Sequence, residues 1–389
     1  MTSALLVINA GSSSIKCAIH QAGTLEPLLR GTIDAIGKNA RFRAAGSLSD
    51  KFAGASPPAN GNHEEVTAWL IEAIRQLPGL QVAGAGHRVV HGGLRFDRPV
   101  LVTDEIVAAL GLLTPLAPGH QPHNLAAIAA VAEHWPGLPQ VACFDTAFHR
   151  TQPRLAQLFA LPRSYADEGI LRYGFHGLSY EYVAGVLPEI AGPKADGRVI
   201  VAHLGHGASL CAMRGRRSIA TTMALTALDG LMMGTRCGNI DPGLILHLIR
   251  ERGMSVQAVE DLLDYRSGLL GVSGISDDLR ALEASEDPAA REALDLFAYR
   301  CSREAGSLMA ALGGLDGLVF TAGIGENSAS MRSAICEGLA WTGLRIDNEQ
   351  NNRNATRITG NNSAMDVFVV PTNEELVIAR ALVELLDLG

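Results

Sequence analysis

Charged residues are scarce in this sequence, and basic residues are scarcer than acidic ones. The 389 residues include 32 Lys and Arg against 40 Asp and Glu, so the net charge is −8 and no basic excess is available to coat a nucleic acid. The sequence has no run of 18 apolar residues, and its start, MTSALLVINAG, lacks the basic region of a signal peptide. We therefore expect a cytoplasmic protein without nucleic-acid or membrane partners.

The six cysteines lack the CxxC spacing of metal and redox motifs. In a chain of this size, scattered cysteines indicate reduced and mostly buried thiols rather than a disulfide framework. Hydrophobic residues make up 47% of the chain, and 42 glycines stand against 17 prolines. This composition excludes a disordered or collagen-like chain and allows a sizeable core.

One pattern occurs twice, about half a chain apart. In LLVINAGSSSIKCAIH, β-rich runs at residues 5–9 and 15–20 flank a Gly/Ser turn, and VIVAHLGHGASLCAMR, from Val199, has the same order. A duplicated two-domain α/β protein would show such a repeat. The sequence therefore suggests two α/β domains with a boundary near residue 148.

Other elements follow from hydrophobic periodicity and from capping residues. A helix is expected after Asn62, its N-cap, and it ends before Pro78. Thr372 and Glu375 have the spacing of a capping box, which leaves Glu374 either to favour the helix dipole or to face a site. Further strands are predicted at residues 83–90, 140–144 and 317–321, further helices at 124–135, 243–250, 290–312 and 374–386, and a hairpin with a surface loop at 40–62.

Neither common nucleotide motif is present, since no segment fits a Walker loop or the GxGxxG fingerprint. Three glycine corners remain: NAGSSSIK at residues 9–16, HLGHGAS at 203–209 and AGIGENS at 322–328. Glycine lets backbone N–H groups approach an anion closely, and small hydroxyls add donors. Three such corners in one chain favour a nucleotide site.

Two arginines lie in Gly-flanked apolar segments, where a charge is costly unless it is paired with an anion. They are Arg88 in GHRVVHGG and Arg236 in MMGTRCGNIDP. Asp145, at a strand end in CFDTAFH, either pairs with a buried arginine or holds Mg²⁺, and the sequence leaves both open. Histidine pairs invite a zinc interpretation, but the HExxH motif is absent and we find no third ligand.

The segments together resemble the acetate and propionate kinase family, within the superfamily of sugar kinases, actin and heat-shock chaperones. The resemblance runs end to end through ten blocks in the family's order, which are NAGSSSIK, GHRVVHGG, LAPGHQPHN, FDTAFH, RYGFHG, HLGHGAS, GLMMGTRCGNIDP, SGLLGVSGISDDLR, FTAGIGEN and PTNEEL. It implies two actin-like (ribonuclease H-like) α/β domains with an interdomain nucleotide cleft. The expected lobes are residues 1–147 with 374–389, and residues 148–373, the second carrying nucleotide-binding and dimerisation surfaces.

The resemblance also implies an activity, which is reversible, direct in-line transfer of the ATP γ-phosphoryl group to a short carboxylic acid, giving an acyl phosphate and ADP. The expected cofactors are ATP/ADP and Mg²⁺, with Mn²⁺ as an alternative, and a homodimer is expected. Acetate is the expected substrate. A carboxylate is already ionised at neutral pH and needs no general base, so the main task of the site is to neutralise the charges of two anions. The two arginines perform this task, and Arg88→Ala and Arg236→Ala are therefore predicted to abolish turnover with little loss of folding.

The family's functional residues map onto this sequence in four groups. The catalytic group is Asp145, Arg88, Arg236, His176 and His120. The nucleotide group is Lys16, Ser12, Ser14, His203, Gly205, His206, Gly207, Asp278, Leu279, Arg280, Gly323, Ile324, Gly325 and Asn327. The substrate group is Arg88, Val90, Gly119, Phe175 and Ala227, and the metal group is Asn9 and Glu374.

Departures from the family pattern leave the activity and the substrate open. The usual HLGNG is HLGHG here, so His206 replaces an asparagine, and Ala220 replaces an aspartate. Gly119 and Ala227 replace a leucine and a proline of the acyl pocket, so an enlarged pocket for propionate or butyrate is one hypothesis, unless His123 or Leu225 fills the space. A catalytically impaired nucleotide sensor is a second hypothesis, and an actin-like binding or chaperone module is a third.

Overall fold

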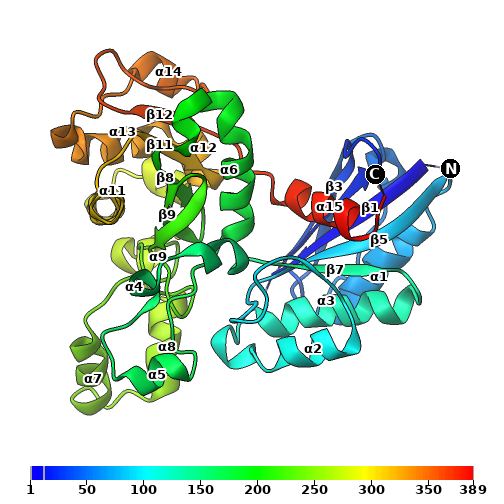
Figure 1. The fold of residues 1–389 in the computed structure, drawn as a ribbon. Coiled ribbons are helices and arrows are strands. Elements are labelled where there is room, and N and C mark those ends of the chain that lie inside the picture. Colours follow the sequence, from blue (N-terminus) through cyan, green and yellow to red (C-terminus); the bar gives the residue numbers. More distant parts are fainter. Residues whose placement is uncertain (1, 12–13, 389) are drawn as a thin grey trace. The chain divides into compact units, whose positions relative to one another are not determined.

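The computed structural model describes residues 2–11 and 14–388. The chain forms two compact units: unit 1 combines Met1–Phe148 with Asn373–Gly389, and unit 2 is His149–Thr372. Each unit is a sheet flanked by helices (Figure 1), which confirms the predicted α/β class. Every helix in the described ranges is too short or too polar to cross a membrane.

In the described part of unit 1, the strands form one sheet with the order β4-β3-β2-β1-β5-β7-β6. These strands are β1 (Thr2–Ala10), β2 (Ile15–Gln21), β3 (Pro27–Asp34), β4 (Arg41–Ala45), β5 (Leu80–Val89), β6 (Val100–Leu101) and β7 (Gln140–Phe144). The first four strands are antiparallel neighbours. In contrast, β5 pairs in parallel with both β1 and β7.

The described residues of unit 2 form a second sheet with the order β10-β9-β8-β11-β12. Its strands are β8 (Arg198–Leu204), β9 (Ala208–Arg214), β10 (Arg217–Thr221), β11 (Gly317–Thr321) and β12 (Asp366–Val369). Here β8, β9 and β10 are antiparallel, and β11 pairs in parallel with β8 and β12. Both sheets therefore share three consecutive antiparallel strands followed by two parallel ones, and the first sheet adds β4 and β6 at its edges. This shared order agrees with the repeat suggested by the two hairpins.

The helices divide between the same two units. Those of unit 1 are α1 (His63–Arg75), α2 (Asp104–Gly111), α3 (Gln121–His134) and α15 (Glu374–Leu385), with short 3₁₀ turns η1 (Ser49–Phe52) and η2 (Thr114–Leu116). Those of unit 2 are α4 (Arg154–Gln157), α5 (Arg163–Asp167), α6 (Gly177–Ala191), α7 (Pro242–Arg250), α8 (Val256–Tyr265), α9 (Gly268–Ser273), α10 (Leu279–Glu283), α11 (Pro288–Leu312), α12 (Ala322–Asn327), α13 (Ala329–Gly338) and α14 (Asn348–Asn352). The remaining 3₁₀ turns, η3 (Ala147–Thr151), which spans the boundary, η4 (Gly192–Asp196) and η5 (Ala340–Thr342), complete the described elements.

Strand alternation determines which helices cover each face of the first sheet. Alternate residues of β1, namely Ala4, Leu6 and Ile8, belong to one buried cluster with side chains of α1 and α3. On the other face α15 lies close to β5, and a Cβ on Gly86 would come within 2.4 Å of Ile378 Cγ2. Figure 1 shows α15 and the α1/α3 pair on opposite faces of this sheet. Glycine in β5 therefore permits the close approach of α15.

Several predicted elements are confirmed, but short elements without strong periodicity were missed. The strands at 140–144 and 317–321 have the predicted bounds, and the predicted helices at 243–250, 290–312 and 374–386 correspond to α7, α11 and α15. The predicted start of α3 is three residues late, because Pro122 occupies its first turn. The segment 40–62 contains β4, which pairs with β3, and then η1.

The capping prediction is confirmed for α1 and wrong for α15. Asn62 and Glu65 form a capping box, in which the Asn62 side chain accepts from the Glu65 N–H and the Glu65 carboxylate accepts from the Asn62 N–H. At α15 the N-cap is Asn373, whose Oδ1 accepts from the Leu376 N–H at 3.1 Å. The Thr372 hydroxyl instead forms a hydrogen bond with Ser179 Oγ at 2.8 Å.

The six cysteines are reduced thiols, and five of them are buried, with Cys237 half-buried. This confirms the prediction of reduced and mostly buried thiols. Burial raises the pKa of Cys17 and of Cys211 to about 12, so these thiols stay protonated at neutral pH. They contribute packing to the core rather than nucleophiles.

A buried histidine makes the stability of unit 1 depend on pH. His87 in β5 is 1% exposed, and its Nε2 lies 2.8 Å from Gln140 Oε1 in β7. Burial lowers the pKa of His87 from 6.5 to about 4. Between these two values the unfolded chain binds a proton that the folded chain does not. We therefore expect His87 to remove about 3 kcal/mol from the free energy of unfolding as the pH falls from 6.5 to 4.

This pH dependence is measurable by urea unfolding at pH 7, 6, 5 and 4 in a Trp341→Phe background. Of the chain's three tryptophans, Trp69 and Trp135 then remain, and both belong to unit 1. His87→Gln keeps an N–H donor without a titratable ring, so its curve should be flatter by about 1.4 kcal/mol per pH unit over this range. Parallel curves for the two proteins would contradict the assignment. Burial also lowers the pKa of His91 to about 4, which explains why a slope remains in the variant.

Candidate active site

In unit 1, predicted site residues gather at the ends of the parallel strands. β1, β5 and β7 run in parallel and end side by side. Asn9 and Arg88 are the last residues but one of β1 and β5, and Asp145 directly follows β7. Glu374 opens α15, which packs on the same strands. The carboxyl ends of parallel strands are where α/β sheets bind ligands, so the topology assembles one polar cluster from four distant segments.

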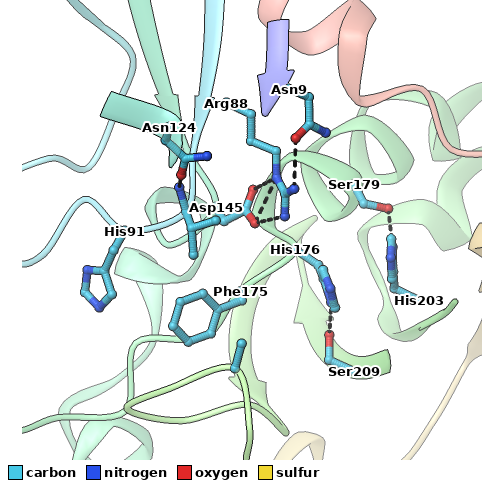
Figure 2. A network of polar contacts seen from close by, with 12 residues as sticks. Asn9, Arg88, His91, Asn124, Asp145, Phe175, His176, Ser179, His203 and Ser209 are labelled. Carbon is cyan, nitrogen blue, oxygen red and sulfur yellow. Dashed lines mark hydrogen bonds and ion pairs between the residues drawn. The ribbon is translucent and has the colours of Figure 1, made fainter. Parts of the chain in front are cut away.

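Arg88 is the centre of this cluster, as Figure 2 shows. Its Nε donates to Asp145 Oδ1 at 3.0 Å, its Nη2 donates to Asp145 Oδ2 at 2.5 Å, and its Nη1 donates to Asn9 Oδ1 at 3.1 Å. Asp145 is 1% exposed, whereas the Arg88 side chain is 20% exposed. Burial alone would lower the pKa of Arg88, but the Asp145 carboxylate raises it above its ordinary value. The guanidinium is therefore permanently charged and fixed in a bidentate geometry. Asp145 therefore forms the arginine pair, which was one of the two interpretations left open for it.

Glu374 adds a second carboxylate beside this pair. Burial raises the pKa of Glu374, the Asp145 carboxylate raises it further, and the Arg88 and Lys16 cations oppose both effects. A site with two carboxylates and the Asn9 amide offers hard oxygen donors, which suit Mg²⁺ when phosphate oxygens and water complete its coordination. The described residues include no cluster of three or more His, Cys, Asp or Glu that would hold a metal alone. These residues therefore fit a metal that arrives with a phosphate.

An asparagine to which the sequence assigns no role supports the same cluster. Asn124 in α3 is 2% exposed; its Oδ1 accepts from the Val90 N–H at 2.9 Å and its Nδ2 donates to Ala10 O at 2.7 Å. These two hydrogen bonds connect Val90, directly after β5, with Ala10 at the end of β1. A polar residue on the buried face of an apolar helix was the signal that could have identified it.

The other predicted residues of unit 1 surround this cluster. Lys16 is an exposed residue of β2, and the corner before it is closed by a hydrogen bond from the Gly11 N–H to Ser14 O at 2.8 Å. Ser12 lies outside the described residues. His120 is the N-cap residue of α3, and His123, one turn along, packs its ring on His63 at 4.4 Å between centroids.

In unit 2, two predicted histidines form a stacked pair. The rings of His176 and His203 are 4.1 Å apart and tilted by 18°. His176 Nδ1 lies 2.8 Å from Ser209 Oγ, and His203 Nδ1 lies 2.8 Å from Ser179 Oγ, as the dashed lines in Figure 2 show. His176 also has a left-handed backbone, with φ of 59°, at the start of α6.

Arg236 reaches the same region of unit 2 through the second glycine corner. A Cβ built on Gly207 would lie 3.3 Å from His176 Nε2 and 3.4 Å from Arg236 Nη2. Both nitrogens therefore face the Gly207 backbone. Arg236 Nη1 donates to Ala227 O at 2.7 Å, which fixes the guanidinium plane. An imidazole and a guanidinium thus face a backbone corner without a side chain, an arrangement suited to a phosphoryl group.

Most of the predicted nucleotide residues of unit 2 line one cavity of about 680 Å³. Its lining includes eight of them, namely Gly205, His206, Asp278, Leu279, Arg280, Gly323, Ile324 and Asn327. Three more lie elsewhere: His203 stacks on His176, Gly207 faces Arg236, and the Gly325 carbonyl accepts from Arg332 Nη1 at 2.9 Å. A cavity of this volume, with small residues and a few polar groups, has the size of a small-molecule site.

The two residues that depart from the family pattern in the predicted functional blocks, His206 and Ala220, lie in different cavities of unit 2. His206 Nε2 lies 3.1 Å from Asp277 Oδ2, and the Cβ that Gly234 lacks would lie 2.6 Å from the His206 ring. Ala220 lines a separate cavity of about 270 Å³ together with Arg172 and Asp229, which form an ion pair at 3.3 Å. His206 therefore lines the predicted nucleotide cavity, where Asp277 holds its ring and Gly234 leaves room for it.

Glu326 is another residue to which the sequence assigns no role. Its Oε1 accepts from the Ala322 N–H at 2.8 Å and from the Thr372 N–H at 3.0 Å. It thereby fixes the first turn of α12, where Ala322 has φ of 65°, and the end of unit 2. Its place in GIGEN, between two assigned residues, was the available signal.

The four predicted acyl-pocket residues belong to two units. Val90, which is buried, and Gly119, which is half-buried, belong to unit 1; Phe175, which is buried, and Ala227, which is half-buried, belong to unit 2. Leu225, near Ala227 in sequence, is half-buried, and His123 packs on His63.

The sequence and the fold of this chain are similar to those of known proteins. The model of the acetokinase family matches residues 4–380. An acetate kinase of Rhodopseudomonas palustris is 52% identical over the full length of both chains. Among solved structures, a propionate kinase of Francisella tularensis has a TM-score of 0.90 at 36% identity and covers 97% of this chain and 98% of its own. An acetate kinase of Porphyromonas gingivalis has a TM-score of 0.88 at 33% identity, with 99% and 100% covered.

These similarities extend along the whole chain and agree with the order of the ten sequence blocks and with the two related sheets. They identify the two α/β units as the actin-like fold of these kinases. The chain belongs to the acetokinase family.

Proposed function

We propose that this chain is an acetate kinase, which transfers the γ-phosphoryl group of ATP to acetate and, in reverse, makes ATP from acetyl phosphate. Its similarity to acetate kinases at about half identity over the full chain supports this activity. The single structural observation that carries the proposal is the Arg88–Asp145 pair at the strand ends of unit 1. A carboxylate substrate is already ionised at neutral pH, so its site requires a fixed cation rather than a general base.

Arg88 and Arg236 divide the electrostatic work of this reaction in our proposal. Arg88, held by Asp145 and Asn9, binds and orients the acyl carboxylate, and Arg236, with His176 Nε2, stabilises charge on the transferring phosphoryl group. A loose, metaphosphate-like transition state needs positioning and charge neutralisation more than covalent chemistry. His120, at the start of α3, is proposed as a further group at the acyl side.

ATP is proposed to bind in the cavity of about 680 Å³ in unit 2. Its glycine-rich lining, from Gly205 and Gly323, allows close approach of backbone N–H groups to phosphates. Asn9 and Glu374 are the residues that would hold Mg²⁺, or Mn²⁺ in its place, and the bound metal supplies neutralisation of phosphate charge. Lys16 and the serines of the first corner are proposed to contact phosphate oxygens.

The length of the acyl chain that the enzyme prefers is a separate question from the type of reaction. The missing side-chain volume at Gly119 and Ala227 favours a second candidate, a kinase that accepts propionate or butyrate. The structural neighbour named a propionate kinase is as similar in fold as the one named an acetate kinase, so fold does not decide. One methylene in an apolar pocket changes kcat/KM by roughly 10- to 200-fold.

The experiment is formation of acyl phosphate from MgATP, trapped as the hydroxamate, with acetate, propionate and butyrate at matched concentrations. We expect product with acetate. Restoring volume with Gly119→Leu should lower kcat/KM for butyrate at least tenfold relative to acetate, since added side chain displaces the longer acyl group. No product from any acid, with ATP still bound, would overturn the kinase proposal and favour the nucleotide sensor.

The helix α7 in unit 2 exposes apolar side chains. All residues of α7 are described by the structure, and none of them is buried. Two of its leucines are strongly exposed, Leu244 at 43% and Leu246 at 48%. We place a second copy of this chain on this apolar helix, giving a homodimer. Sedimentation should show twice the 41.0 kDa chain mass, and Leu246→Glu should release monomers. The six reduced thiols, scattered without any CxxC spacing, favour a reducing, cytoplasmic compartment.

A further inference from the structure

Two hydroxyl groups lie behind His176 and have no assigned role in the reaction. Ser209 Oγ, in β9, is 2.8 Å from His176 Nδ1 and 2.5 Å from the Tyr180 hydroxyl, in α6. Ser209 and Tyr180 are both fully buried. Tyr180, Ser209 and His176 therefore form a continuous chain of hydrogen bonds, whose far end, His176 Nε2, faces Gly207.

The direction of this chain follows from the chemistry of its members. A phenol is a better donor and a poorer acceptor than an aliphatic alcohol, because its oxygen lone pair is delocalised into the ring. Burial raises the pKa of Tyr180 well above its ordinary value, so its proton stays in place. Tyr180 O–H thus donates to Ser209 Oγ, and the Ser209 O–H donates to His176 Nδ1. A neutral imidazole that accepts at Nδ1 carries its proton on Nε2.

We propose that Tyr180 and Ser209 are positioning residues that hold His176 as the tautomer protonated at Nε2, so that a neutral N–H donor faces the phosphoryl group. This inference rests on the proposed function for its role in catalysis. A ring protonated at Nδ1 instead would present a lone pair to an anion, which is repulsive. The stacked ring of His203, fixed by its own bond to Ser179, limits rotation of His176 and so keeps Nε2 in place.

The tautomer is measurable without turnover. Protein labelled with ¹⁵N-histidine gives long-range ¹H–¹⁵N correlations in which a protonated and an unprotonated ring nitrogen differ widely in chemical shift. The His176 signals are assigned by their loss in His176→Gln. We expect a protonated Nε2 and an unprotonated Nδ1 in the wild-type protein near neutral pH. A proton on Nδ1 would overturn the proposal, even if the enzyme phosphorylates acetate.

Variants then connect the tautomer with catalysis. Ser209→Ala should reduce the population protonated at Nε2 and lower kcat by about 10- to 100-fold, while the KM values for ATP and acetate change less than threefold. Tyr180→Phe should produce a smaller change in the same direction, and Ser209→Thr should restore both signals and kcat. Ser209→Ala with wild-type ring signals and wild-type kcat would contradict the proposal.

The matched control removes the same group from another buried histidine of unit 2. Ser218 Oγ lies 2.9 Å from His149 Nδ1, so Ser218→Ala should change the His149 signals and leave His176 protonated at Nε2. Dispersed signals of the other histidines show whether each variant is folded. If Ser209→Ala does not fold, Tyr180→Phe alone decides, since it must shift the His176 signals toward Nδ1 protonation. A wild-type chain that shows the expected tautomer but makes no acyl phosphate would remove the proposed function and leave the tautomer assignment standing.

Discussion

Arg236→Ala is expected to lower kcat by about 10³- to 10⁵-fold, the range by which an arginine acting on a phosphoryl transition state accelerates transfer. Its guanidinium faces Gly207 beside His176 Nε2, and no alanine can supply that charge. Folding should change little. The variant loses the hydrogen bond to Ala227 O, which is worth about 1 kcal/mol. It also removes a positive charge near the half-buried carboxylate of Asp264. Although burial raises the pKa of Asp264, the Arg236 charge lowers it, so this carboxylate becomes easier to protonate in the variant.

The control for this prediction is Arg216→Ala, which removes an exposed arginine of the same unit that pairs with Asp196 at 2.8 Å. Its kcat should match the wild type, because an exposed ion pair contributes little. Calorimetric titration with ADP should show that Arg236→Ala retains nucleotide binding. A variant that keeps a tenth of the wild-type kcat would rule out the role assigned to Arg236.

The sequence predicted the framework well because its signals are local. A hydrophobic period, a capping asparagine and a glycine corner each depend on a few adjacent residues, and so β1 with β2, β8 with β9, and α1 were identified correctly. The α15 cap was predicted wrongly because a tertiary contact competes. Ser179, 193 residues away, binds the Thr372 hydroxyl, and Asn373 then takes the capping role.

The site was predicted by resemblance more fully than by physical reasoning from the residues. Asp145 can pair with Arg88 because β5 and β7 are neighbouring strands, with Val89 in register with Phe144. No local sequence pattern predicts that these two strands are neighbours. The same limit applies to Ser209 and Tyr180, which reach His176 only after the sheet of unit 2 has formed. Asn124 and Glu326 were missed for this reason also, since their partners are distant in sequence or are backbone groups.

Arg88→Ala differs from Arg236→Ala because it should abolish activity and also destabilise unit 1. The sequence alone predicts little loss of folding for both variants, but the structure separates them. Asp145 is 1% exposed and receives two hydrogen-bonding nitrogens of Arg88, so the variant leaves a buried carboxylate without its cation. Breaking one partner of a buried pair costs about 3–5 kcal/mol. Glu374 nearby adds to the cost, because the Arg88 charge opposes the effect of burial on its pKa.

A double-mutant cycle separates the two effects. Arg88→Ala combined with Asp145→Asn removes the unpaired charge while keeping the shape of the side chain, so most of the lost stability should return, whereas acyl phosphate formation should stay at least 10³-fold below the wild type. Urea unfolding in the Trp341→Phe background, where Trp69 and Trp135 report unit 1, measures the stability of each protein. Arg88→Lys serves as the conservative comparison, since it keeps a charge near Asp145 but lacks the planar fork that holds two carboxylate oxygens. If Arg88→Ala unfolds at the same urea concentration as the wild type, the ion pair is not holding Asp145 in the folded state. If the double variant regains activity together with stability, Arg88 supports the fold alone and another cation must orient the acyl carboxylate.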